Sequence, residues 1–301
     1  MDFTSCKRII SKAYNGANGK KIAVEYDGKR YMLKFPPSGK NKPTELSYTN
    51  SCFSEHIGST IFNMVGIRAQ NTMLGTFDIN GKKKSVCACE DFTSDGSVLY
   101  DFCSIKNTII DSEHEGSGTE LTDLLETIEK QQFVNSEELL EHFWNVFIMD
   151  TLLGNFDRHN GNWGLLYHSS SDESEIAPVF DCGSCLLPQA DEKLMSKVMK
   201  EEDELNARIY RFPTSAIHHN GRKINYYDFL LSMEDDNCTK ALIRMLPRID
   251  LDKINAFIDK EQYLTTTQKK FYQYYIAQRY EKILMAVHRK FNKSASGLQK
   301  K

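Results

Sequence analysis

The sequence predicts an α+β protein in two parts, with a small β-rich part in front of a larger, mainly helical part. Two hairpin patterns with one helix between them fill the first part, and helical periodicity dominates after Glu201. A polar, glycine-bearing stretch at 93–119, which we expect to be irregular, lies between them. We therefore expect an N-terminal lobe at residues 1–92 and a C-terminal lobe at residues 93–301, without internal repeats.

The N-terminal lobe begins with a predicted hairpin. The runs IAVEY and RYMLKF flank Asp27 and Gly28, a pair that readily adopts positive φ in a tight turn. The preceding loop, AYNGANGKK, contains Asn15, Gly16 and Gly19, which allow a tight backbone with exposed N–H groups. The second strand ends at a Pro-Pro pair. These features predict two paired strands behind a glycine-bearing loop.

A helix and a second hairpin complete this lobe. Phe53, Ile57 and Ile61 recur at helical spacing, which predicts an amphipathic helix over 51–65 that ends before Gly66. The runs TMLGTFDI and SVCACEDF then flank an Asn-Gly turn, which predicts two further strands. We expect these elements to form one small α+β lobe.

The C-terminal lobe is predicted to have a buried helix at its centre. Asn135 precedes Glu138 in the manner of a capping box, and a wide apolar face continues to Leu152 before Gly154 ends the helix. After it come the polar turn GNFDRHNGN, a short strand around WGLLY, a polar loop HSSSDESE and a second strand APVFD. A long helix is expected over 267–292.

The composition is that of an ordinary globular protein, with 40% hydrophobic and 26% charged residues. The formal net charge of -3 gives no overall attraction to nucleic acid or anionic membranes, and we interpret the Lys82–Lys84 cluster as a solvated surface. No run resembles the apolar core of a secretion signal or reaches the ~20 apolar residues of a membrane span. We expect a cytoplasmic protein without a membrane span or direct nucleic-acid partner.

The eight cysteines are scattered, which favours a reducing compartment over a disulfide-bonded scaffold. Cys87 with Cys89 and Cys182 with Cys185 could together form a structural zinc site. The alternative is that Cys87 and Cys89 share one face of a strand, because side chains two residues apart point the same way. We favour this alternative.

Three residues around the predicted hairpin after Gly154 suggest an oxygen-rich metal site. Asp157 and Asn162 lie five residues apart on one turn, and Asp181 follows the second predicted strand. Two carboxylates and an amide suit Mg²⁺ better than zinc. Upstream, Lys34 lies on a strand behind the glycine-bearing loop, and Glu55 on the following helix could hold it against phosphate oxygens. These are the components of a phosphotransferase.

Four motifs together resemble those of the HipA-like kinase family. They are D-x-H-x-x-N at Asp157, His159 and Asn162, FDCG at 180–183, LKFPPSG at 33–39, and SEHI with a later GI around Glu55 and Gly66. The chain is most similar to the short CtkA-type members, from about residue 15 to at least residue 189. The resemblance implies a two-lobed protein-kinase-like fold, with ATP held in the cleft between the lobes.

The resemblance also implies a role for each motif residue. Asp157 would be the catalytic base that orients the acceptor hydroxyl, and Asn162 and Asp181 would hold Mg²⁺. Lys34 would contact the ATP phosphates, and Glu55 would fix Lys34. Positioning and charge neutralisation of this kind are what phosphoryl transfer requires.

Further residues would contact the nucleotide at the rim of the cleft. These are Asn15, Gly16 and Gly19 in the loop, Cys89, Glu90 and Asp91 at the end of the hinge strand, and His159, which would support the catalytic loop by hydrogen bonding. Asn15 stands where many HipA-like proteins carry a serine that becomes phosphorylated, so inhibitory autophosphorylation is not expected there. Gly161 replaces a basic residue, which makes DRHNGN similar to the DRHxxN loop of phosphoinositide kinases as well.

We therefore expect an ATP- and Mg²⁺-dependent Ser/Thr protein kinase of bacterial origin that phosphorylates protein hydroxyls and itself. The resemblance implies a bacterial toxin, with a small antitoxin as its partner, or an effector secreted or translocated into host cells without a classical signal peptide. Two alternatives stay open: a phosphoinositide-type lipid kinase, and a non-catalytic nucleotide-binding scaffold.

Overall fold

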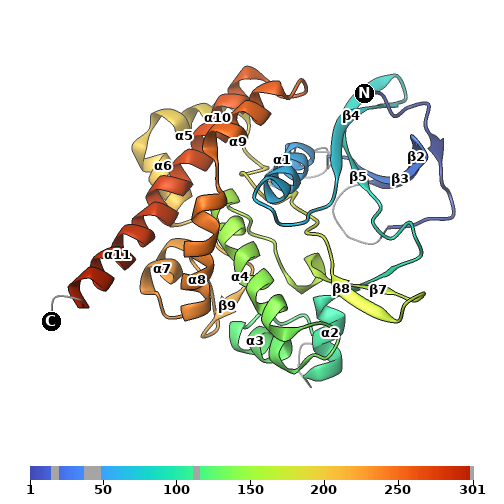
Figure 1. Cartoon of the computed structure of the whole chain (residues 1–301). Helices are drawn as coiled ribbons and strands as arrows, with labels where there is room; N and C mark the ends of the chain where they lie inside the picture. The colour runs from blue at the N-terminus through green and yellow to red at the C-terminus, as the bar shows by residue number, and fades with distance from the viewer. Residues whose placement is uncertain (15–19, 37–48, 111–115, 299–301) are drawn as a thin grey trace.

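The structure, a computed structural model, describes residues 1–14, 20–36, 49–110 and 116–298, with side chains described to residue 293. A β-sheet with one helix lies at the upper right of Figure 1, and a larger group of helices extends from the upper left to the bottom. The α+β class predicted from the sequence is confirmed. The exact division of the lobes at residues 92 and 93 stays a prediction.

The N-terminal lobe is built on an antiparallel sheet in the strand order β1-β2-β3-β5-β4. Its strands are β1 (Lys7–Arg8), β2 (Lys21–Tyr26), β3 (Lys29–Lys34), β4 (Thr72–Ile79) and β5 (Lys82–Glu90). Asp27 and Asn80, each followed by glycine, adopt φ of 49° and 53° at the two hairpin turns. Both predicted hairpins therefore form, because their turn residues tolerate the left-handed conformation.

Helix α1 (Ser51–Met64) packs against one face of this sheet. Ile57 and Ile61 are fully buried, and Gly66 follows the helix with φ of 81°, as its position predicts. The helix is also tied to the C-terminal lobe at its beginning. Asn50 Nδ2 donates to the carbonyl of Ala190 at 2.6 Å, and Asn50 Oδ1 accepts from Gln268 Nε2 at 3.0 Å. Helix α1 is thus held by both lobes.

The C-terminal lobe is mainly helical. Its helices are α2 (Phe102–Ile109), α3 (Leu121–Lys130), α4 (Ser136–Leu153), α5 (Glu192–Lys200), α6 (Glu202–Tyr210), α7 (Tyr226–Ser232), α8 (Asp236–Met245), α9 (Leu251–Lys260), α10 (Thr266–Arg279) and α11 (Ala286–Leu298). A π-helical segment at Tyr280–Met285 joins α10 to α11. Helix α4 lies at the centre, with Trp144 and Ile148 fully buried. Asn135 caps its first turn, and Gly154 ends it with φ of 64°.

The expectation that 93–119 is irregular is wrong. This stretch contains β6 (Val98–Asp101) and α2. Asp101 caps α2 by accepting from the backbone N–H of Ser104 at 2.8 Å, and Phe102 and Ile105 are buried. An eight-residue helix offers too few turns to give a clear apolar period, so tertiary burial decided its structure.

The prediction of a strand at APVFD is also wrong. Strand β7 (Gly164–His168) pairs instead with β8 (Glu173–Ile176), which lies partly within the predicted polar loop. The backbone of Val179 leaves the hairpin and exchanges hydrogen bonds with Arg68 and Gln70, at 2.9 and 2.8 Å. The segment that leads to Asp181 is therefore extended but hydrogen-bonded to the N-terminal lobe, at the connection between α1 and β4.

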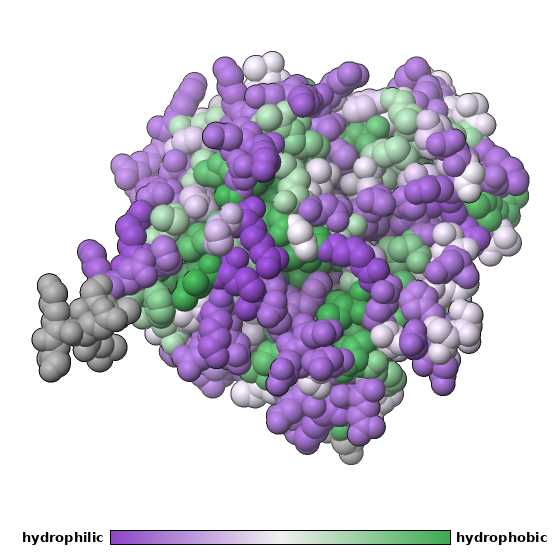
Figure 2. All heavy atoms as spheres, viewed as in Figure 1, coloured by the Kyte–Doolittle hydropathy of each residue, from purple (hydrophilic) through white to green (hydrophobic). Residues whose placement is uncertain are grey.

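The surface seen in Figure 2 is mostly hydrophilic, with hydrophobic residues in separate small groups on this face. Within the described ranges, no helix combines the length and the apolar character that crossing a membrane requires.

Candidate active site

The loop after α4 is organised around Arg158, which is 5% exposed. Its guanidinium binds both carboxylate oxygens of Asp150, on the last turn of α4, at 3.0 and 3.2 Å. It also donates to the backbone carbonyls of Asn162, at 3.0 Å, and Phe180. Burial acts to lower the pKa of Arg158, but the Asp150 carboxylate raises it well above its usual value. This buried pair joins α4, the loop and the segment that leads to Asp181.

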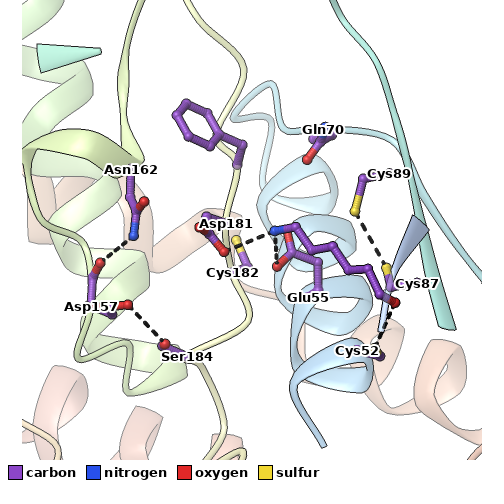
Figure 3. A network of polar contacts seen from close by, with 12 residues as sticks. Cys52, Glu55, Gln70, Cys87, Cys89, Asp157, Asn162, Asp181, Cys182 and Ser184 are labelled. Atoms are coloured by element: carbon purple, nitrogen blue, oxygen red, sulfur yellow. Dashed lines mark hydrogen bonds and ion pairs between the residues drawn. The ribbon is translucent and has the colours of Figure 1, made fainter. Parts of the chain in front are cut away.

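Asp157 lies in this loop with its carboxylate facing the cleft. Its backbone N–H donates to Asn155 Oδ1 at 3.0 Å. Ser184 Oγ lies 3.5 Å from Asp157 Oδ2 (Figure 3), and His159 Nε2 lies 4.0 Å from Oδ1. Burial raises the pKa of Asp157, and the carboxylate of Asp181 raises it further. A carboxylate with a raised pKa accepts a proton more readily, which suits a catalytic base.

Of the two predicted metal ligands, Asp181 lines the cleft and Asn162 lies beside Asp157. Asn162 Nδ2 donates to the backbone carbonyl of Asp157 at 2.7 Å, so its acceptor Oδ1 is turned away from that carbonyl. Asp181 adopts φ of 55°, and its side chain is 40% exposed. The Lys34 ammonium, 3.0 Å from Asp181 Oδ1, lowers the pKa of Asp181. In Figure 3, Asp181 lies between Asn162 and Glu55.

Lys34 and Glu55 are in contact. Lys34 Nζ lies 2.9 Å from Glu55 Oε2, and Glu55 is fully buried. Among the described residues, the Glu55 oxygens have this ion pair and no hydrogen-bond partner. Burial acts to lower the pKa of Lys34, but the carboxylates of Asp181 and Glu55 raise it well above its usual value. Glu55 therefore lies inside the cleft, in contact with Lys34.

The side chains of Lys34, Glu55, Asp157 and Asp181 line a cavity between the lobes. Its charged and hydroxyl side chains include Lys21, Lys34 and Glu55 from the N-terminal lobe and Asp157, Asp181 and Ser184 from the C-terminal lobe. Burial, followed by the charge of Lys34, lowers the pKa of Lys21. The two lysines can neutralise charge on phosphate oxygens, and carboxylates in the same cleft can hold a metal ion.

The backbone near the end of β5, predicted to meet adenine, already has protein partners. The Glu90 carbonyl accepts from Gln70 Nε2 at 2.9 Å, and the Asp91 N–H donates to the Arg30 carbonyl at 2.8 Å. The Cys89 side chain is fully buried. Because a carbonyl has two lone pairs, the Glu90 oxygen can accept a second hydrogen bond. Adenine contact at these residues stays a prediction.

The carboxylate of Asp91 holds the chain that leads into the glycine-bearing loop. It accepts from Tyr14 Oη at 2.9 Å and from Thr93 Oγ1 at 2.6 Å. Burial acts to raise the pKa of Asp91, but these hydrogen bonds keep it below its usual value. The predicted nucleotide-contacting loop residues lie outside the described residues: Asn15, Gly16 and Gly19.

His159 and Gly161 fit together within the loop. His159 Nδ1 accepts from the Gly161 N–H at 3.0 Å, which assigns the proton of the neutral ring to Nε2. A Cβ atom at position 161 would lie 3.0 Å from His159 Cε1. The glycine that replaces a basic residue therefore makes room for this ring. The structure places His159 beside Asp157, and its contact with nucleotide stays a prediction.

The cysteine pairs have separate surroundings. Cys87 and Cys89 lie along β5 with their sulfur atoms 3.8 Å apart, as expected for one face of a strand. Cys182 is fully buried, and Arg158 Nη2 lies 3.6 Å from its sulfur. A hydrogen bond from Cys185 and the charge of Arg158 lower the pKa of Cys182. In the described part of the chain, no three or more His, Cys, Asp or Glu side chains form a metal site.

The donor set fits Mg²⁺ bound together with ATP. Asp181 and Asn162 offer carboxylate and amide oxygens, which a hard cation prefers. Two protein ligands leave most of the octahedral shell to phosphate oxygens and water, as is usual for Mg²⁺ at nucleotide sites.

Several residues that build the site could not be identified as site residues from the sequence. Arg158, Asp150 and Ser184 have the contacts described above, and Asn160 Nδ2 donates to the carbonyls of Gly116 and Gly118 at 2.8 and 2.9 Å. One signal was available, because Asp150 interrupts an apolar helical run and a buried carboxylate requires a cationic partner. The partner itself could not be named from the sequence.

Comparison with known proteins decides the family. The family model described as "HipA-like C-terminal domain" matches residues 13–227. This chain belongs to the HipA-like family. It is 47% identical over 289 residues to "Serine/threonine-protein kinase CtkA" of Helicobacter pylori strain J99, a match that covers 96% of this chain and 87% of that protein.

Solved structures agree with this result. The crystal structure of the "Helicobacter pylori proinflammatory kinase CtkA" matches with a TM-score of 0.90 at 47% identity, over 96% of this chain and 97% of that chain. HipA of Shewanella oneidensis MR-1, in its complex with HipB and operator DNA, matches in fold with a TM-score of 0.59 at 16% identity, over 95% of this chain and 74% of that chain. The two-lobed kinase-like fold is confirmed, and the chain is an enzyme of the serine/threonine protein kinase class.

Proposed function

We propose that this protein transfers the γ-phosphoryl group of ATP to serine and threonine hydroxyls of proteins in the cleft between the lobes. The observation that carries the proposal is the joint placement of Lys34, Glu55 and Asp181 opposite Asp157. Each of these side chains alone has ordinary structural explanations. Together they supply the phosphate-binding cation, the metal ligand and the base that phosphoryl transfer requires.

In the proposed reaction, the acceptor hydroxyl gives its proton to Asp157 as its oxygen attacks the γ-phosphorus. The bond from that phosphorus to the β,γ-bridging oxygen breaks, and ADP leaves. Lys34, fixed by Glu55, neutralises charge on the phosphates, and Asp181 and Asn162 would hold Mg²⁺. The metal ion would neutralise the charge that develops on the phosphate oxygens.

Radiolabelled ATP tests the reaction directly. The wild-type protein is incubated with γ-labelled ATP, Mg²⁺ and a generic protein acceptor, and label is followed in the acceptor and in the protein itself. We expect transfer to serine and threonine of the acceptor. A parallel reaction with phosphoinositide vesicles tests the lipid-kinase alternative, and transfer to lipid alone would exclude a protein acceptor. ATP binding without any transfer would favour the scaffold alternative.

Two variants separate the roles of the carboxylates. Asp181→Asn is expected to weaken Mg²⁺-dependent ATP binding as well as turnover, because an amide holds a hard cation less well. Asp157→Asn is expected to leave ATP·Mg²⁺ binding nearly intact and to lower kcat by about 10²–10⁴-fold, the usual effect of losing a general base. Calorimetric titration and transfer rates measure both. Loss of ATP binding in folded Asp157→Asn would contradict the role given to Asp157.

For the biological role, the comparisons support the protein kinase class and nothing finer. The likeness to the HipA–HipB complex is one of fold at 16% identity. A toxin role, a delivered effector role, autophosphorylation and a small antitoxin partner stay predictions from the family resemblance.

A further inference from the structure

Ser184 connects the metal-binding segment to the catalytic loop. Its Oγ lies 3.5 Å from Asp157 Oδ2, and the side chain lines the same cavity as Asp181 and Lys34 (Figure 3). Ser184 is 8% exposed, so its hydroxyl is held against the cavity wall instead of moving in solvent. At 3.5 Å the contact is longer than an ordinary hydroxyl–carboxylate hydrogen bond. Such contacts in ligand-free sites commonly shorten when the substrate binds.

The backbone around Ser184 is fixed by its neighbours. The Cys185 N–H donates to the Cys182 carbonyl at 3.1 Å and closes a turn that contains Ser184. Cys182 is in turn held by Arg158 at 3.6 Å. A Cβ atom at position 183 would lie 3.2 Å from Glu55 Oε2, so the turn also fits closely against helix α1. Ser184 is thus presented to Asp157 by a rigid support.

The two oxygens of Asp157 have different neighbours as a result. Oδ2 faces the Ser184 hydroxyl at 3.5 Å. Oδ1 lies 4.0 Å from His159 Nε2, which belongs to a half-exposed ring. A carboxylate without either neighbour could rotate freely about its last torsion, which is broad and roughly two-fold. A hydroxyl donor at one oxygen limits this rotation and leaves the other oxygen for an incoming acceptor.

We propose that Ser184 is a positioning residue for phosphoryl transfer: its hydroxyl donates to Asp157 Oδ2 and orients the carboxylate so that Oδ1 receives the acceptor hydroxyl. The inference rests on the proposed role of Asp157 as base. It adds that the segment carrying Asp181 sets the orientation of the base, since Asp181 directly precedes the turn that contains Ser184. Positioning of the metal and of the base would then be coupled through the three peptide bonds between residues 181 and 184.

Substitutions at Ser184 test the role of the hydroxyl. Ser184→Ala is expected to lower kcat for a protein acceptor by about 10-fold and to leave the calorimetric Kd for ATP·Mg²⁺ unchanged. Ser184→Thr, which keeps the hydroxyl, is expected to retain most of the wild-type kcat. Ser97→Ala is the matched control, because Ser97 is also 8% exposed and its hydroxyl contacts His168 at 2.8 Å, away from the cavity. That variant should keep wild-type kcat.

A double variant tests whether Ser184 acts through Asp157. If it does, Asp157→Asn with Ser184→Ala has the same residual kcat as Asp157→Asn alone, because the effects are not additive. The positioning role is overturned if Ser184→Ala keeps wild-type kcat, if Ser184→Thr loses as much as Ser184→Ala, or if the two losses multiply. Transfer by the wild-type protein with unchanged Ser184→Ala kinetics would refute this inference alone. Absence of any transfer by the wild-type protein would refute the proposed function together with it.

Discussion

At the scale of single residues, the described part of the cleft contains a buried carboxylate, Glu55, whose charge is compensated by one ion pair with Lys34. Glu55 is fully buried, and among the described residues its carboxylate has Lys34 as its ion-pair partner. Lys34 has a second carboxylate partner, because Asp181 Oδ1 lies 3.0 Å from its ammonium group. The two residues therefore differ in what their loss leaves behind. Removing Glu55 leaves a lysine that is still paired, whereas removing Lys34 leaves an unpaired buried carboxylate.

This asymmetry predicts different stabilities for two variants. Lys34→Met is expected to lower the free energy of unfolding by about 3 kcal/mol, the cost of leaving a buried charge uncompensated. Glu55→Gln should cost less, and adding it to Lys34→Met should restore most of the stability while leaving the double variant without kinase activity. Guanidinium denaturation compares the three variants. Wild-type stability in Lys34→Met would show that Glu55 is not held by Lys34.

At the scale of elements, helix α4 carries a titratable group behind the active-site loop. His142 lies on α4, and burial lowers its pKa to about 4, with the charges of Arg158 and Arg68 acting in the same direction. In the unfolded chain the pKa of histidine is near 6.5. As the pH falls below this value, the unfolded chain takes up the proton first. The contribution of His142 to stability is therefore complete above pH 6.5 and is lost as the pH falls toward 4.

Replacement of His142 by glutamine tests this prediction. Between pH 7.5 and pH 5.0, the wild-type protein should lose roughly 2 kcal/mol more unfolding free energy than His142→Gln, because the variant has no proton to take up at this position. Denaturant titrations at the two pH values measure the difference. Equal losses in both proteins would mean that the folded chain protonates His142 as easily as the unfolded chain does.

At the scale of the whole molecule, the proposed nucleotide site is shared between the lobes. Lys34 and Glu55 come from β3 and α1, whereas Asp157 and Asp181 come from the C-terminal lobe. Helix α1 is further tied across the interface by Asn50. A ligand that binds both sets of residues should therefore stabilise the protein as one unit.

The expected shift in melting temperature follows from mass action. At an ATP·Mg²⁺ concentration of 100 times its Kd, the folded state gains about 2.7 kcal/mol, which raises the Tm by about 4 °C for a protein of this size. Chelation of Mg²⁺ with EDTA should remove most of this shift. Differential scanning fluorimetry with ATP, with and without Mg²⁺, measures it. An equal shift with EDTA present would show that ATP binds without the metal ligands Asn162 and Asp181.

The sequence by itself determined many of the local elements and predicted the chemistry of the site. The turns at Asp27 and Asn80 and the end of α1 before Gly66 follow from backbone conformations that few residues tolerate. The cap at Asn135 follows from its side-chain oxygen, which accepts from the first backbone N–H groups of α4. The residue types at the motif positions predict a metal-dependent phosphotransferase. Such properties depend on residues close together in the chain, so a single sequence contains them.

The tertiary structure alone decided which residues meet across the chain. Helical spacing could not distinguish a cleft-facing Glu55 from an exposed one, because both lie off the apolar stripe; packing of α1 against β5 placed it against Lys34. Helix α2 was missed because the burial of Phe102 and Ile105 fixes it, and strand β8 was missed because its backbone pairing with β7 fixes it. Contacts such as Arg158 with Asp150 and Ser184 with Asp157 depend on long-range packing, which sequence spacing does not encode.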